Sequence, residues 1–203
     1  MGIIESIKMK MKMRGALRDA QSYATALTSL STLLFTVAYK CTEACKQSID
    51  DKFGKDTNEA KFIFLRVFYE YIYFLLHVAD RMVLSGYGPA IRARFQEELY
   101  PLVQKGSTEA FCAHWPDEIK ARINADFVDN INSANNDYAS CKSVYNQEAP
   151  LAVSSLIGKL GQRISMVLEL KDLSLSVVST MAGMQALSLM NLKVVLADVC
   201  KRL

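Results

Sequence analysis

Polar side chains that could bind a ligand recur at helical spacing in the first half of the chain. The candidate ligand-binding residues, which we name the polar stripe, are Arg66, Glu70, Tyr73, His77, Asp80 and Arg81. His77 and Asp80 are three positions apart, so in a helix the carboxylate can orient the imidazole or share a metal ion with it. Arg66 and Glu70 are four positions apart and can form an ion pair. A stripe that faces other helices would predict a buried site, whereas a stripe that faces water is an ordinary solvated edge.

Other groups of reactive side chains fit catalysis poorly. A di-iron bundle needs two Glu-x-x-His motifs, but the residues three positions before the two histidines are Phe74 and Phe111. Cys112 is close in sequence to His114, yet no third residue is identifiable that would orient such a nucleophile pair. We therefore expect no catalytic residue, no bound metal, no cofactor and a protein that is not an enzyme.

A single predicted helix, Glu59 to Leu84, carries the polar stripe. At 100° per residue, the ionisable side chains between Arg66 and Arg81 fall within an arc of about 100°, and apolar side chains cover the other 260° or so. An ordinary surface helix has an apolar face only somewhat wider than about 100°. We therefore expect other helices, a partner chain or lipid to cover this helix on several sides.

The remaining segments also predict helices. Apolar residues recur every three or four positions over 19–49, 89–104, 117–147 and 151–203, with a split near Asp172 and a short helix over 107–113. The run from Asp56 to Glu59 is typical of a capped helix start, Gly86 to Pro89 of a helix end, and Pro101 of a kink or end. The sequence predicts a single all-α domain over residues 1–203, an antiparallel bundle of four or more long helices with short accessory helices.

Composition limits the class of protein. The 203 residues are 51% hydrophobic and 22% charged, which excludes a wholly disordered chain, and the net charge of +3 is too small to predict nucleic-acid binding. Five dispersed cysteines fit reduced thiols in the cytoplasm. Cys41 and Cys45 have helical spacing, but no second ligand pair at zinc-site spacing accompanies them.

Residues 1–18 form a basic segment in which Lys8, Lys10, Lys12 and Arg14 alternate with isoleucine and methionine. We interpret it as a frayed terminus, with contact to anionic lipid or to a partner groove as the alternatives. The uncharged stretches 21–39 and 173–192 contain many serines and threonines. We interpret them as amphipathic helices of a soluble protein, with membrane contact as the alternative.

Three hypotheses for function follow. The first is a non-enzymatic interaction or structural protein of the cytoplasm that forms a homodimer or homo-oligomer, or docks a protein partner, through surplus apolar surface. The second is a ligand- or metal-binding bundle with its site on the stripe formed by Arg66, Glu70, His77 and Asp80. The third is a protein attached to a membrane through its basic start and uncharged helices.

Overall fold

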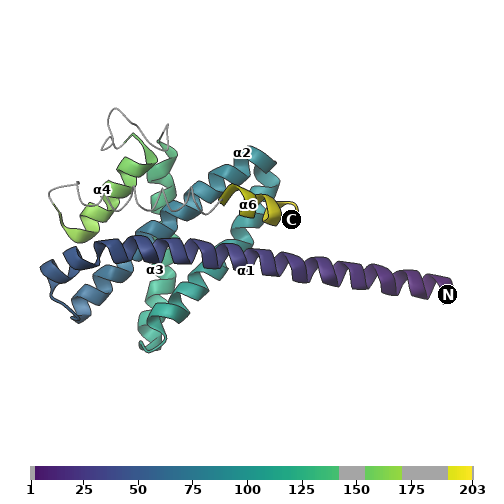
Figure 1. Cartoon of the computed structure of the whole chain (residues 1–203), viewed down its shortest axis with the longest axis horizontal. Helices are drawn as coiled ribbons and strands as arrows, with labels where there is room; N and C mark the ends of the chain where they lie inside the picture. The colour runs from purple at the N-terminus through teal and green to yellow at the C-terminus, as the bar shows by residue number, and fades with distance from the viewer. Residues whose placement is uncertain (1–2, 142–153, 171–191, 203) are drawn as a thin grey trace.

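The computed structural model describes residues 3–141, 154–170 and 192–202, with side chains from residue 21 onward. This described part is all-α, as predicted, with five helices and no strand. The helices are α1 (Ile3–Phe53), α2 (Asn58–Cys112), α3 (Asp117–Ala139), α4 (Leu156–Leu168) and α6 (Leu192–Cys200). Two long helices, α1 with 51 residues and α2 with 55, form the frame on which the others pack (Figure 1).

Helix α1 starts at Ile3 rather than near Asp19, so the backbone of the basic segment is helical. Lysine, methionine and arginine are good helix formers, and Gly15 alone does not interrupt the run. Figure 1 shows the N-terminal part of α1 extending well beyond the rest of the chain. Further along, the predicted apolar face is confirmed, since the residues at its spacing are buried: Leu27, Leu30, Leu34, Val37 and Cys41.

A tight link after Phe53 turns the chain back on itself. Gly54 has φ +86°, a left-handed conformation that glycine adopts without a Cβ clash. The Thr57 hydroxyl then accepts a hydrogen bond from the Ala60 amide at 3.0 Å, so the next helix starts within the predicted run 56–59, with Thr57 as its cap. The link therefore makes α1 and the start of α2 a helical hairpin.

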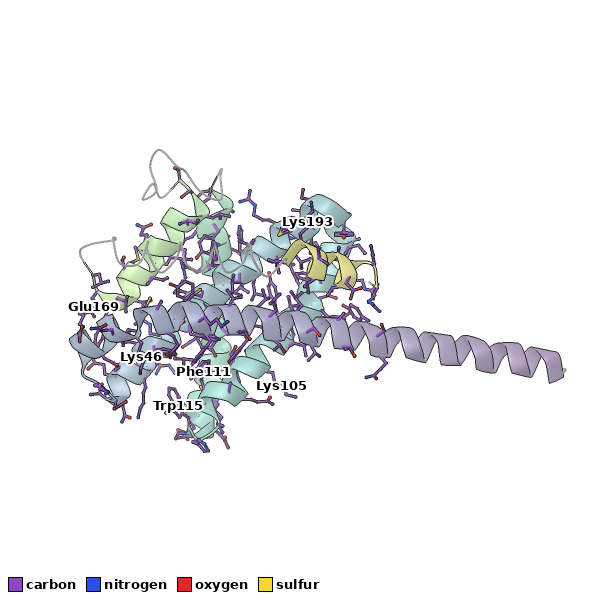
Figure 2. The ribbon with its side chains drawn as sticks, in the orientation of Figure 1. Lys46, Lys105, Phe111, Trp115, Glu169 and Lys193 are labelled. Atoms are coloured by element: carbon purple, nitrogen blue, oxygen red, sulfur yellow. The ribbon has the colours of Figure 1, made fainter. Side chains whose placement is uncertain are left out.

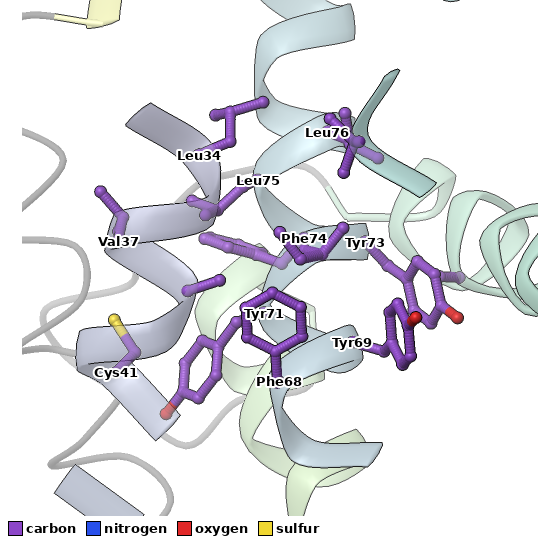
Figure 3. Packing of buried hydrophobic residues seen from close by; sticks show 14 of the residues in the cluster. Leu34, Val37, Cys41, Phe68, Tyr69, Tyr71, Tyr73, Phe74, Leu75 and Leu76 are labelled. Carbon is purple, nitrogen blue, oxygen red and sulfur yellow. The ribbon is translucent and has the colours of Figure 1, made fainter. Parts of the chain in front are cut away.

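The first half of α2, residues 58–87, is the buried centre of the fold. Every residue from Val67 to His77 is buried except Glu70, which is half-buried. Figure 3 shows Phe68 and Tyr71 on the side of α2 that faces α1, while Tyr69 and Tyr73 point to another side. The prediction that this helix is covered on several sides is confirmed, and its own chain provides the cover. The surplus apolar surface on which the first hypothesis relied is therefore not free.

Gly88 bends α2 sharply, with φ 84° and ψ 178°, and Pro89 starts the second half of the helix. The predicted break at the glycines is thus present. The predicted end at Pro101 is wrong, because α2 continues to Cys112 and so includes residues 107–112 of the segment 107–113 predicted as a separate helix. Pro101 is on the exposed side of the helix, while Leu99 and Val103 on the inner side are buried and hold the helix in place.

Helix α3 begins after the predicted break at Pro116 and buries one apolar face, formed by Phe127, Ile131, Ala134 and Tyr138. It ends at Ala139, so the helix predicted over 117–147 is shorter than expected. Helix α4 ends at Leu168, where Glu169 has φ 51°, so a single helix over 151–203 is excluded. The predictions for 142–150, for the split at Asp172 and for the uncharged stretch 173–191 lie outside the described residues.

Within the described residues, α2 contains the one window long and apolar enough to cross a membrane, with a mean hydropathy of 1.5. Of that window, 72% is buried inside the structure, and a core helix of a soluble protein has the same character.

Candidate functional site

The structure places the polar stripe along one edge of the first half of α2. Arg66 and Arg81, near its two ends, are exposed, whereas Tyr73, His77 and Asp80 are buried. Burial also raises the pKa of Tyr73 above its usual 10.0. The middle of the stripe therefore faces other helices and is not the solvated edge that we considered.

Glu70 joins α2 to α4 through Arg163. The guanidinium donates from Nε to Glu70 Oε2 at 2.6 Å and from Nη1 to Asp137 Oδ2 at 2.5 Å, so α3 takes part as well. The side chains of Glu70 and Arg163 are each only 12% exposed. Burial opposes the charge on Arg163, but the hydrogen bonds and negative charges of Glu70 and Asp137 outweigh it and raise the pKa of the guanidinium.

His77 joins α2 to α3. Its Nδ1 lies 2.9 Å from Asn135 Oδ1, so Nδ1 carries the proton that it donates to the amide oxygen. Burial lowers the pKa of His77 below 6.5, and the positive charges of Arg81 and Arg92 lower it further. The Asn135 contact and the charge of Asp80 act in the opposite sense, and the net shift is downward. The ring is therefore neutral at pH 7.

Two buried polar atoms beside this contact have no hydrogen-bond partner among the described residues: His77 Nε2 and the Tyr138 hydroxyl. The two rings pack with their centroids 5.2 Å apart. Burial raises the pKa of Tyr138 well above 10.0, so its hydroxyl is protonated. An accepting nitrogen and a donating hydroxyl are groups that buried water commonly links.

Asp80 joins the two halves of α2 across the Gly88 bend. Arg92 binds its carboxylate through Nε and Nη2 at 2.8–2.9 Å, and Gln96 donates to Oδ1 at 2.7 Å. The Asp80 side chain is 3% exposed, and its hydrogen bonds raise the pKa of Arg92. The carboxylate is thus occupied by side chains from its own helix.

The stripe therefore forms contacts between helices, and its acidic groups already have protein partners. No cluster of three or more histidine, cysteine, aspartate or glutamate side chains able to hold a metal ion occurs among the residues that the structure describes. All five cysteines are buried, and burial raises the pKa of Cys41 to about 12, so this thiol is neutral.

Sequence reasoning missed a surface feature formed by aromatic side chains from three separate segments. We name it the aromatic groove: a hollow of about 300 Å³ between the end of α1, the start of α2 and the end of α2, lined by Tyr39, Phe64, Phe111 and Trp115. Phe111 is its centre, with ring centroids 4.7–6.4 Å from those of Phe68, Phe35, Tyr39 and Phe64. Figure 2 labels Phe111 and Trp115 on the same side of α1.

A second hollow of about 590 Å³ adjoins the groove and shares Trp115 and Lys61 with it. It adds Phe62, which is 47% exposed, and Ile119, which is 43% exposed. Together with Tyr39 at 40%, these side chains form one exposed apolar surface around the only tryptophan of the chain. Periodicity could not reveal it, because its residues come from segments that are distant from one another in the sequence.

Arg81, at the end of the stripe, lines another hollow of about 670 Å³ with Lys193 of α6. Apolar side chains form most of its remaining wall, including Val78, Met82 and Leu196. Among the described residues that line it there is no carboxylate. Two cations beside an apolar wall suit an anion that carries an apolar body.

No protein-family model, curated protein or solved structure matches this chain.

Proposed function

We propose that this chain is a non-enzymatic helical protein of the cytoplasm that binds an apolar segment of a protein chain in the aromatic groove. The observation that supports this role is the exposure of Tyr39, Phe62 and Ile119 around the half-buried Trp115, which lines both hollows. Tryptophan and tyrosine are enriched among the residues that contribute most to protein binding. Contiguous exposed apolar side chains mark interaction surfaces more often than scattered single side chains do.

The shape of the groove suits anchor side chains from a helix or an extended segment. Phe111 is fixed by four ring contacts, so the floor of the groove is rigid before a partner arrives. Glu43, Lys46 and Lys61 stand at the rim, where charged groups select partners without being buried. A rigid apolar floor with a charged rim is the usual anatomy of a binding surface.

Site-specific photo-crosslinking tests this proposal. We expect p-benzoylphenylalanine in place of Phe62 to form one discrete adduct in cells, and the same amino acid in place of Met166, which is 66% exposed on α4, to form none. Ile119→Asp in the Phe62 variant should abolish the adduct without unfolding the chain, because Ile119 is exposed. Equal adducts from both positions, or an adduct that Ile119→Asp leaves unchanged, would contradict a docking role for the groove.

The ligand-binding alternative retains one supporting observation, the hollow beside Arg81 and Lys193. We expect an anilinonaphthalene sulfonate dye, an apolar anion, to bind there and to lose affinity in Arg81→Gln. The same affinity for the dye in the wild type and the variant would count against this alternative.

Several other expectations stay proposals. The antiparallel bundle is supported by the reversals of direction at Gly54 and Gly88, if the two halves of α2 are counted as separate helices. Peripheral membrane contact through residues 1–18 is still a proposal. The expectation that the protein does not bind nucleic acid is also still a proposal.

A further inference from the structure

We propose that the occupant of the aromatic groove is the N-terminal arm of a second copy of this chain, where the arm is residues 3–20 of α1. This inference rests on the docking role proposed above and names the partner. The two copies would pair their α1 helices antiparallel, so that each arm lies in the groove of the other copy.

The backbone of the arm lies apart from the other helices that the structure describes. Figure 1 shows this part of α1 projecting away from every other helix, and 18 residues of helix span about 27 Å. A helix of this length without tertiary contacts is only marginally stable in water. Its sequence contains Ile3, Ile4 and Ile7 and three methionines, a large apolar content for a helix whose backbone projects from the other described helices. Such a segment gains stability when an apolar surface covers it.

The chemistry of the arm matches that of the groove. Methionine sulfur packs favourably against aromatic rings, and lysine and arginine bind the faces of tyrosine and tryptophan. Residues 3–20 carry five cationic side chains against two carboxylates. The wall of the groove carries three carboxylates, Glu43, Asp50 and Asp56, against two lysines. One of those lysines, Lys46, lies 3.7 Å from Asp50 on the same helix.

Because the arm and part of the groove lie on the same helix, α1, each of the two copies can place its arm in the groove of the other. The arm occupies one end of α1 and the groove the other, so an antiparallel pair with a two-fold axis between Thr28 and Ser29 brings each arm level with a groove. In that register position 18 of one copy is level with position 39 of the other, and position 14 with position 43. Arg18 is then level with Tyr39, and Arg14 with Glu43. Both matches combine a cation with a ring or a carboxylate.

The middle of α1 allows two such helices to approach closely. Its exposed side between the arm and the groove carries Thr25, Thr28, Ser29 and Thr32 and no charged residue of α1, and the C-terminal residues Asp198 and Arg202 border it only beside Thr25 and Ser29. Each of these hydroxyls donates to the carbonyl oxygen four positions earlier, at 2.8–2.9 Å. Small side chains with satisfied hydroxyls need no water and let helix backbones pack closely.

A charge exchange in the full-length chain tests the register. We expect the wild type to sediment as a dimer, and Arg14→Glu and Glu43→Arg each to weaken dimerisation by about tenfold or more, because each places like charges opposite one another twice per dimer. The double variant Arg14→Glu/Glu43→Arg restores both attractive pairs and should recover the dimer. Lys105→Glu, at a side chain that is 75% exposed on the second half of α2, is the matched control and should not change it. Circular dichroism confirms that each variant is folded.

The outcomes separate this inference from the docking role. A wild-type chain that stays monomeric at about 100 μM, or a dimer that the charge exchange does not restore, overturns the self-docking inference. If position 62 then still crosslinks to a different protein, the docking role stands with another occupant. With the crosslinking amino acid at position 62, an adduct of two copies of this chain should form in the otherwise wild-type chain and in the double variant, but in neither single variant. That result supports both the docking role and the self-docking inference.

Discussion

Replacing Arg163 by methionine tests whether the polar stripe holds the helices together. Methionine keeps much of the side-chain length and removes the charge, so the half-buried Glu70 loses its partner while the packing changes little. Breaking a buried ion pair from one side costs about 3–5 kcal/mol. The side chains of Glu70 and Arg163 are each 12% exposed, so residual solvation of Glu70 places the expected loss near the lower end, about 3 kcal/mol. Asp137 adds little, because its side chain is 41% exposed.

Urea denaturation followed by circular dichroism measures this loss as a lower midpoint at constant m-value. In a chain of this size about 3 kcal/mol corresponds to a fall in Tm of about 6–12 °C. Removing the stranded charge as well, in Arg163→Met/Glu70→Gln, should recover about half of the lost stability, because no buried charge is then left unpaired. The exposed pair Lys105–Glu109 gives the control, and Lys105→Met should change stability by no more than about 0.5 kcal/mol. A loss below about 1 kcal/mol in Arg163→Met, or strictly additive losses in the double variant, would refute the reasoning.

Two further predictions concern the pH dependence and the bend of α2. Because burial lowers the pKa of His77 below 6.5, the unfolded chain takes up a proton that the folded chain does not, so stability falls as the pH drops below 6.5, by up to about 1.4 kcal/mol per pH unit. His77→Gln should flatten this dependence, and an identical profile in His77→Gln and in the control His114→Gln, at the other histidine, would contradict it. Gly88→Ala should cost about 1–3 kcal/mol in urea denaturation, because φ 84° with ψ 178° strains any residue with a Cβ. Gly86→Ala, at a helical position with open space around it, should be neutral or stabilising, and equal losses at both positions would show that strain at Gly88 is not the cause.

Features of the fold that depend on neighbours in sequence could be predicted. The spacing of Leu30, Leu34 and Val37 determines which face of α1 is buried, because side chains three and four positions apart share a helix face. Thr57 and Gly88 act on the backbone within a few residues, so their types indicate a helix start and a bend. The enclosure of the central helix followed from its apolar circumference alone.

Features that depend on distant residues could not be predicted. The partner of Glu70 is Arg163, which belongs to another helix, and periodicity does not state which helix faces which. The same limit hid the aromatic groove, because Phe64 and Phe111 come together only after the chain bends at Gly88. Pro101 misled for the opposite reason, since its local preference for ending a helix was overridden by the buried residues around it.

The polar stripe and the aromatic groove perform different tasks for the same helix. A helix with apolar side chains over most of its circumference gains similar energy from a neighbour at many angles, so burial alone does not select one arrangement. Glu70 binds Arg163 of α4, His77 binds Asn135 of α3, and Asp80 binds Arg92 in the second half of α2. Any other packing arrangement breaks these contacts and leaves a buried charge or hydrogen-bonding group without its partner. The free energy lost in this way exceeds what new apolar contacts provide. The stripe therefore fixes the angle at which the second half of α2 returns, and that angle brings Phe111 against both Tyr39 and Phe64 to form the groove.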